Sequence, residues 1–329
     1  MAKATRVLHL NDCAFVGRNL VRVAQNQGRP WRLLPPERTW PPVRPGRTTP
    51  TRAASYSTIG RVALGAGWAD VVHVHYATTV ARLLPPYVPN RPYVLHLHGT
   101  DIRTLWRLPE RHATIQRYID GAAHVYFSTP DNEANAVDAR PDAEYLPVVI
   151  DETSLPPWRP SGYVAFASRW EQVKGLEDML NVAARLLRAG VEVRGLDWGP
   201  GAAEARQLGV KLIPKAPHAT YLDFLAGANV VVGQATRILS VSELEAMAIG
   251  APVAAVGHHF PGPDGRPLPI RNGDLDTVVD AILSDMSDPV AAATTLASRE
   301  WTLHHHVPAR QLDRLQATYD RIRGGAPLR

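Results

Sequence analysis

The segment Arg237-Ile-Leu-Ser-Val-Ser-Glu-Leu-Glu-Ala-Met-Ala-Ile-Gly250 carries the clearest folding signal in this chain. Ser240 and Glu243 have the spacing of a capping box, in which each side chain bonds to the backbone N–H of the other residue. Apolar residues then recur at helical spacing, and Gly250 stands where a left-handed helix cap belongs. The sequence therefore predicts a short helix with a defined start at Ser240.

The residues before this helix predict a buried strand, because the run Asn229-Val-Val-Val-Gly233 is apolar and short. The helix would then begin just past the carboxyl end of a strand. In open α/β sheets anionic ligands bind at this place, since free backbone N–H groups and the helix dipole point there. The sequence therefore predicts an anion site at the start of the helix.

A second predicted strand, Tyr163-Val-Ala-Phe-Ala167, leads to Arg169 and then to Lys174 at the head of a predicted helix over 176–189. An arginine fork and a lysine charge on one loop can hold a pyrophosphate between them. Only four of the 36 basic residues are lysines, so a specific role for Lys174 is worth testing against the alternative of a solvated loop lysine.

Taken together, these motifs resemble the nucleotide-sugar domain of GT-B glycosyltransferases, specifically of the retaining family 4 type. The resemblance implies an α/β protein of the GT-B fold, with two Rossmann-like domains facing a central cleft. It places an N-terminal, acceptor-side domain over 1–155 and a donor-binding domain over 156–307, with a last helix near 308–323 packing back on the first. The motifs that carry the resemblance are Ser168-Arg169, Lys174-Gly175, Pro217-His218, Ala228-Asn-Val-Val-Val232 and Glu245-Ala-Met-Ala-Ile-Gly-Ala-Pro-Val253.

The resemblance also implies roles for single residues in the donor domain. Arg169 and Lys174 would hold the donor diphosphate and act in catalysis, assisted by the backbone amides of Ser240 and Val241. Glu245 would hold the donor ribose. The edge at Lys211-Leu-Ile-Pro-Lys215 would read the nucleobase, which makes Leu212 and Ile213 candidate base contacts.

In the first domain, the resemblance singles out Gly17, His98 and Asp101. Gly17 lies on the loop that approaches the donor phosphates and sugar, although a glycine that merely starts a helix is an alternative. His98 heads the His-Gly-Thr-Asp101 loop and would contact the donor sugar. Asp101 would orient the acceptor hydroxyl or cap the next helix.

One position departs from the family pattern. The family places a second glutamate eight residues before Glu245, where this chain has Arg237. An arginine cannot accept hydrogen bonds from sugar hydroxyls, although it could meet a phosphate or a carboxylate. The presence of Arg237 therefore leaves undecided which sugar is transferred and whether the protein is catalytically active.

Histidines alternate in Asp70-Val-Val-His-Val-His75 and again in Pro92-Tyr-Val-Leu-His-Leu-His98. Such spacing can indicate a metal site. Because the family works without a metal and no Asp-x-Asp motif is evident, we expect no bound metal. His73, His75 and His96 are instead expected to pack and hydrogen-bond within a sheet.

Composition favours a water-soluble, cytoplasmic enzyme. The 329 residues suffice for two domains, and no apolar run approaches the roughly 18 residues that a bilayer span needs. We therefore expect no stable membrane insertion. Cys13 is the only cysteine, which excludes a disulfide within the chain and a cysteine-based metal site.

Positive charge is concentrated in the first half, where residues 1–150 carry 18 Lys and Arg against 11 Asp and Glu. This predicts a polyanionic partner such as DNA, anionic lipid or a phosphorylated acceptor, with ordinary solvation as the alternative.

The proline-rich segment 35–52 is predicted to be extended or disordered, with no helix. It would bind the acceptor by phosphate contacts and stacking, or else be only a flexible loop. The candidate acceptor residues within it are Arg38, Trp40, Arg44 and Arg47.

The resemblance thus implies a retaining, metal-independent hexosyl- or pentosyltransferase without a further cofactor, whose donor is a nucleotide sugar, with UDP-sugars as the first choice. The acceptor hydroxyl could belong to a small molecule. Alternatively, the chain could be a phage-type DNA glycosyltransferase that acts on a hydroxylated base. A third alternative is a nucleotide-sugar-binding protein that has lost catalysis.

Overall fold

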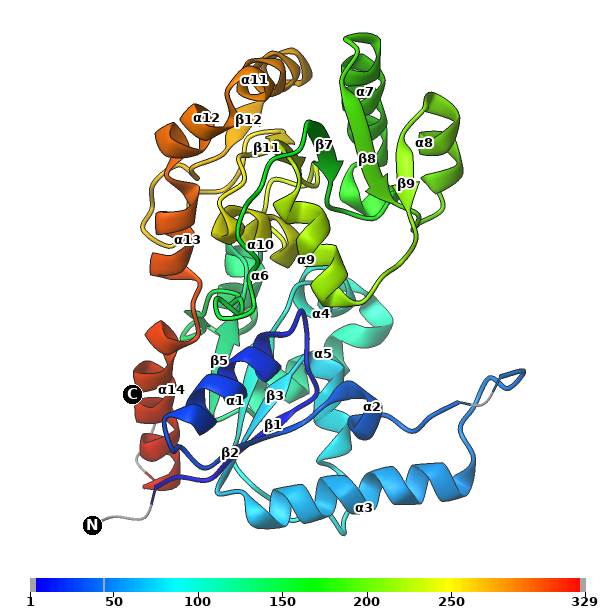
Figure 1. The fold of residues 1–329 in the computed structure, drawn as a ribbon. Helices are drawn as coiled ribbons and strands as arrows, with labels where there is room; N and C mark the ends of the chain where they lie inside the picture. Colours follow the sequence, from blue (N-terminus) through cyan, green and yellow to red (C-terminus); the bar gives the residue numbers. More distant parts are fainter. Residues whose placement is uncertain (1–3, 44, 326–329) are drawn as a thin grey trace. The chain divides into compact units, whose positions relative to one another are not determined.

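The structure is a computed structural model, and it describes residues 4–43 and 45–325. The chain forms two compact units, one made of Met1–Val149 with Pro308–Arg329 and the other of Ile150–Val307. Each unit contains a six-stranded sheet covered by helices (Figure 1), and every strand pair in both sheets is parallel. The predicted α/β fold class is therefore confirmed.

The sheet of the first unit has the strand order β2-β1-β3-β4-β5-β6. One of its faces packs an aliphatic core that includes Leu8, Val72 and Leu95. Side chains alternate between the two faces of a strand, so His9, His73 and His96 lie on the opposite face. The strands are β1 Val7–Leu10, β2 Trp31–Leu34, β3 Val71–His75, β4 Tyr93–Leu97, β5 His124–Phe127 and β6 Glu144–Tyr145.

The last helix of the chain, α14 (Ala309–Arg323), belongs to this first unit. Tyr319 Oη lies 2.5 Å from His73 Nδ1, and Thr318 Oγ1 lies 2.8 Å from Tyr126 Oη. These buried polar contacts attach α14 to the histidine-bearing face of the sheet. The other helices of this unit are α1 Val16–Asn26, α2 Pro36–Thr39, α3 Arg52–Trp68, α4 Thr100–Arg103, α5 Pro109–Asp120 and α6 Glu133–Ala139, with 3₁₀ turns at Ala77–Arg82, Leu105–Arg107 and Pro130–Asn132.

The prediction that segment 35–52 contains no helix was wrong at its start. Pro36–Thr39 form one helical turn, because a proline at the first helical position needs no N–H partner and already has a helical φ. The turn is held by the buried Thr39, whose hydroxyl donates to the Leu34 carbonyl at 2.8 Å. The prediction was also wrong at the last residue of the segment, Arg52, which begins helix α3 after a threonine cap in which Thr51 Oγ1 accepts from Ala54 N.

The sheet of the second unit has the strand order β12-β11-β10-β7-β8-β9. Successive strands run outward from β7 in one direction and from β10 in the other, so the topological switch point lies between these two neighbours. The strands are β7 Tyr163–Phe166, β8 Glu192–Leu196, β9 Lys211–Ile213, β10 Val230–Val232, β11 Val253–Val256 and β12 Arg271–Gly273.

The helix predicted from the opening segment is confirmed as α10, Val241–Ile249. Its capping box is formed, and Gly250 closes it with a φ of 110°. Within the described part of the chain, none of the helices combines the length and hydropathy that a membrane span requires. The remaining helices of this unit are α7 Leu176–Arg188, α8 Ala202–Leu208, α9 His218–Ala226, α11 Leu275–Ser287, α12 Pro289–Leu296 and α13 Ser298–His305, with a 3₁₀ turn at Gln172–Lys174.

Candidate active site

The strongest candidate site in the second unit lies where β7 and β10 end side by side. The loop after β7 carries Arg169 and Lys174, and the loop after β10 carries Gln234 and leads into α10. Ligands of open α/β sheets bind beyond the carboxyl ends of the strands at such a switch point. The sheet order therefore brings together the two segments that the sequence singled out separately.

Direct contacts join these two loops. Lys174 Nζ donates to Gln234 Oε1 at 2.5 Å, and Ala235 N donates to the Lys174 carbonyl at 3.0 Å. Gly175 has a φ of 78°, and a Cβ added there would lie 2.6 Å from Ala235 Cβ. Only glycine fits this close approach, so Gly175 holds the lysine at the switch point.

Arg169 has partners of its own. Its guanidinium lies 3.2 Å from Glu171 Oε1 and 5.0 Å from the centroid of the Trp198 ring. Lys215 Nζ lies 4.4 Å from the same centroid, so the Trp198 ring makes cation–π contacts with both Arg169 and Lys215. The sequence assigned no role to Trp198, although its position just after β8, in an otherwise glycine-rich turn, was a usable signal.

The start of α10 is organised by Glu243, which is almost fully buried. Its carboxylate accepts from Gln234 N at 2.8 Å and from Ser240 N at 2.7 Å. The Ser240 amide, which was predicted to face the ligand, is therefore already used. The amides of Val241 and Ser242 have no hydrogen-bond partner among the described residues. Ser242 was not predicted, although the capping box of Ser240 and Glu243 already implies that the Ser240 amide is bonded to Glu243.

Gly233 leaves the room that Glu243 needs. A Cβ added at Gly233 would lie 2.6 Å from Glu243 Cγ. We expect Gly233→Ala to lower the free energy of unfolding by about 1–3 kcal/mol, since the carboxylate must abandon its buried amide partners. Urea unfolding followed by circular dichroism would measure this loss. The matched control is Gly60→Ala on α3, where an added Cβ meets nothing within 4 Å and the free energy of unfolding is expected to stay equal or rise.

Glu245 lies on α10 beyond this helix start and is buried. Its Oε1 lies 2.8 Å from His218 Nε2 at the beginning of α9, so two motifs of the resemblance meet in space. Leu212 and Ile213 lie on β9, the edge strand of the sheet, and are half-buried. The Ile213 carbonyl accepts from Asp197 N at 2.7 Å.

Arg237 adopts a left-handed backbone conformation with a φ of 66°. Its Nε donates to the His258 carbonyl at 2.9 Å, and its guanidinium lies 5.0 Å from the Phe260 ring centroid. Arg237, which stands where the resemblance would place a glutamate, is thus folded against the loop that follows β11. A left-handed arginine costs roughly 1–2 kcal/mol of strain, which these contacts offset.

Asp101 lies fully buried in the first unit. Its two oxygens accept backbone N–H bonds from Ala77, His98, Gly99 and Ile102 at distances of 2.9 to 3.3 Å. Burial raises the pKa of this carboxyl to about 6, and the backbone bonds oppose the shift. Asp101 therefore fixes the backbone conformation of the loop that carries His98.

His98 is half-buried, and its Nε2 lies 3.0 Å from His75 Nδ1. Burial lowers the pKa of the His98 imidazole well below its usual value. Gly17 packs beside this pair, since a Cβ added there would lie 3.0 Å from His75 Nε2. The Gly17 amide donates to Asp12 Oδ1 at 2.9 Å and is therefore not free for a ligand.

Three buried histidines could in principle hold a metal, since His73, His75 and His96 each offer a ring nitrogen within 4.8 Å of the others. Both ring nitrogens of His75, however, already have histidine partners at 3.0 Å. Because metal ligation would break one of these bonds, the geometry favours the packed and hydrogen-bonded role that was expected for His75.

Three of the four candidate acceptor residues lie among the described residues. Arg38 and Arg47 are exposed, whereas Arg44 lies outside the described residues. The Trp40 ring has the Arg82 guanidinium 4.2 Å from its centroid, so one of its faces is covered. Trp40 therefore offers a stacking ligand at most its other face.

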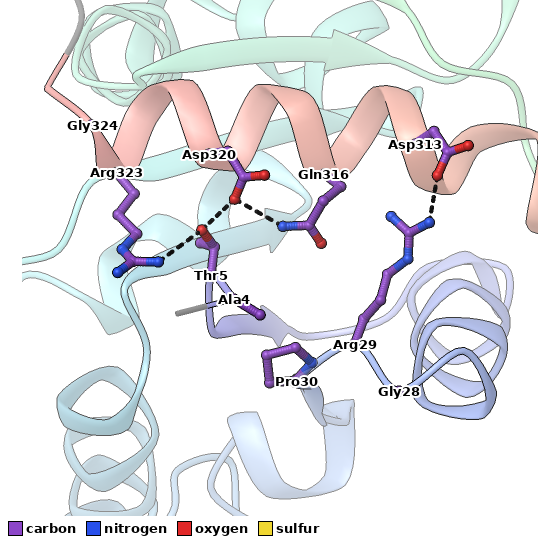
Figure 2. A pocket seen from close by; sticks show the side chains of 10 residues that line it. All are labelled: Ala4, Thr5, Gly28, Arg29, Pro30, Asp313, Gln316, Asp320, Arg323 and Gly324. Carbon is purple, nitrogen blue, oxygen red and sulfur yellow. Dashed lines mark hydrogen bonds and ion pairs between the residues drawn. The ribbon is translucent and has the colours of Figure 1, made fainter. Parts of the chain in front are cut away.

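A cavity of about 780 Å³ lies elsewhere in the first unit, between the start of β1, the loop before β2 and α14 (Figure 2). Two of its acidic side chains already have partners within the cavity, since Arg29 lies 2.5 Å from Asp313 and Asp320 accepts from both Thr5 and Gln316. None of the predicted site residues lines it. It lies at the amino end of β1, whereas α/β ligand sites form at the carboxyl ends of strands.

Solved structures share the architecture at low sequence identity. Sucrose-phosphate synthase from Thermosynechococcus elongatus is 15% identical over 98% of this chain and 100% of its own, with a TM-score of 0.70. HepE from Anabaena, solved with UDP and glucose, is 12% identical over 96% and 99% of the two chains, with a TM-score of 0.66. AviGT4, a glycosyltransferase involved in avilamycin A biosynthesis, is 20% identical over 98% and 99%, with a TM-score of 0.64.

No protein-family model and no curated protein sequence matches this chain. The likeness to solved structures therefore concerns the fold, and it extends over nearly the full length of each protein compared. Two parallel six-stranded sheets with these neighbours show that the chain has the GT-B fold of glycosyltransferases.

Proposed function

We propose that this protein is a retaining, metal-independent glycosyltransferase of the family 4 type that uses a nucleotide-sugar donor, with a UDP-sugar as the first candidate. The observation that carries the proposal is the fixed position of Lys174 at the switch point, joined through Gln234 to the loop that leads into α10. A cation and the amides of a helix start are the groups that bind a diphosphate.

In this proposal the diphosphate is the leaving group. As the bond between the anomeric carbon and the phosphate oxygen breaks, negative charge develops on the β-phosphate. Arg169, Lys174 and the amides of Val241 and Ser242 would stabilise that charge, which is electrostatic catalysis of the oxyanion-hole kind. The acceptor hydroxyl attacks the anomeric carbon from the same face, and its proton passes to the leaving phosphate oxygen.

Three further residues have roles in this proposal. Glu245, held by His218, would accept hydrogen bonds from the donor ribose. His98 would contact the transferred sugar. Asp101 would act as a positioning residue, since its oxygens are occupied by the backbone of the His98 loop.

Binding of UDP tests the donor site directly. A ligand that binds only the native state must stabilise it, by about 2.7 kcal/mol at a hundredfold excess over Kd. We expect UDP to raise the melting temperature of the protein, and Lys174→Ala to abolish most of that rise. Thermal-shift assays with UDP, GDP and ADP would measure both effects. If none of the three raised the melting temperature at millimolar concentration, a nucleotide-sugar site would be excluded.

Donor hydrolysis separates a transferase from a protein that only binds nucleotide sugars. A retaining transferase is expected to release nucleoside diphosphate slowly from its own donor in the absence of acceptor. A panel of nucleotide sugars followed by UDP or GDP release would identify the donor. Binding without any release, together with recovery of release in Arg237→Glu, would instead show that Arg237 has silenced the site.

A further inference from the structure

Three histidines of the first unit form one hydrogen-bonded chain. His9 Nδ1 lies 3.0 Å from His75 Nε2, and His75 Nδ1 lies 3.0 Å from His98 Nε2. His9 and His75 are fully buried, whereas His98 is half-buried at the end of the chain. The three rings come from β1, β3 and the loop after β4.

Such a chain has only two neutral arrangements. A neutral imidazole carries one N–H donor and one acceptor nitrogen, so each bond fixes the tautomer of the next ring. In the first arrangement all three protons are on Nδ1, His9 donates to His75, and His75 donates to His98. In the second all three protons are on Nε2 and both bonds are reversed. The two arrangements give His98 opposite properties at its outer nitrogen, a donor in the first and an acceptor in the second.

The surroundings of His9, the innermost of the three hydrogen-bonded histidines, decide between the two tautomeric arrangements. His9 Nε2 is buried and has no hydrogen-bond partner among the described residues. The first arrangement leaves an unpaired acceptor at this atom, and the second leaves an unpaired N–H. Among backbone groups, buried orphan N–H donors are rarer than under-satisfied acceptors, and we take the same order to hold for the imidazole ring nitrogens. The first arrangement is therefore favoured.

We propose that His9 and His75 are positioning residues that hold His98 in the Nδ1–H tautomer, so that His98 presents a neutral hydrogen-bond donor to its ligand. No described residue bonds to His98 Nδ1, which leaves this N–H available. The ligand atom that it recognises is then an oxygen with a free lone pair, such as a sugar hydroxyl or a ring oxygen. This last step rests on the proposed glycosyl transfer, whereas the tautomer assignment does not.

Correlation of ¹⁵N with ¹H in the histidine rings tests the tautomer without any substrate, because protonated and unprotonated ring nitrogens have well-separated ¹⁵N shifts. Single histidine replacements would assign the rings among the 13 histidines of the chain. We expect His9, His75 and His98 to share the Nδ1–H form, although free histidine prefers Nε2–H. An Nε2–H signal from His98 in the native protein would overturn the proposal.

Two replacements of His9 separate positioning from packing. In His9→Asn the side-chain amide can still donate to His75 Nε2, whereas His9→Phe removes that donor. We expect His9→Phe to lower kcat/KM for the donor about tenfold, the effect of one hydrogen bond, and to return His98 to Nε2–H. His9→Asn should stay within about twofold of the native protein and keep the Nδ1–H signal.

His73→Phe is the matched control. His73 is as fully buried as His9, and its ring stacks on those of His9 and His75 with centroids 4.7 Å apart. It hydrogen-bonds to Tyr319 and not to any of the three linked histidines. Its replacement should leave the His98 tautomer and kcat/KM unchanged. Equal losses in His73→Phe and His9→Phe would overturn the positioning role. Nδ1–H signals in a protein that turns over no nucleotide sugar would instead overturn the proposed function and leave the tautomer assignment standing.

Discussion

Lowering the pH from 7 to 5 is expected to destabilise the first unit strongly. His9, His73, His75 and His96 are fully buried there. Burial lowers the pKa of His9 and of His96 to about 3, and it lowers the pKa values of His73 and His75 well below the usual 6.5. The folded unit therefore excludes protons that the unfolded chain binds.

The sign and size of this effect follow from proton linkage. For a group with a lowered folded-state pKa, the stability contribution is complete above pH 6.5 and is lost as the pH falls toward the folded-state pKa. His9 and His96 each lose about 2 kcal/mol between pH 7 and pH 5, or roughly 4 kcal/mol together, and His73 and His75 act in the same direction. A typical domain has a free energy of unfolding of only about 5–15 kcal/mol, so this loss is a large part of the stability of the first unit.

Urea unfolding at pH 7, 6 and 5 would measure this loss, and hydrogen exchange corrected for intrinsic rates would locate it. Peptides from residues 4–149 should lose protection before those from 150–307. The control is His73→Phe, which removes one of the four protonation sites. Between pH 7 and pH 5 its free energy of unfolding should fall by less than that of the native protein, because one excluded proton is missing. A native unfolding free energy that changed by less than about 2 kcal/mol would show that these rings are not excluded from protonation.

Replacing Lys174 or Arg169 by alanine is expected to lower kcat about a hundredfold or more. Removal of one preorganised donor to developing negative charge costs about 2.7–4 kcal/mol of transition-state stabilisation. Lys174 should show the larger loss, because its position is fixed by Gln234 and by the Ala235 amide. Arg169 must first break its ion pair with Glu171 to reach a phosphate, and the loss of that pair reduces the net binding energy that Arg169 contributes.

A matched control exists in the same unit. Arg185 on α7 pairs with Asp276 and lies outside the switch point. Its replacement by alanine should leave kcat within about twofold, since exposed ion pairs contribute little to stability. Steady-state rates of nucleoside diphosphate release would compare the three variants. Near-native rates in Lys174→Ala would remove the assignment of the donor site.

Local sequence signals predicted the parts of the site that depend on neighbours along the chain. The capping box of α10, the left-handed Gly250 and the strands β7 and β10 were all found where the residue pattern placed them. The one-turn helix α2 was missed, because prolines were treated as helix breakers even at the first helical position. The roles of the site residues stay predictions until the donor experiments are done.

What the sequence by itself determined is therefore the helix α10, the strands β7 and β10, and the positions of the loops that carry Arg169, Lys174 and His98. The tertiary structure alone decided the partners of these residues. Lys174 meets Gln234 across 60 residues, and His73 meets Tyr319 across 246. The physical reason is that capping and helical periodicity act within one turn, whereas the tautomer of a buried histidine depends on strands that pair only in the folded sheet.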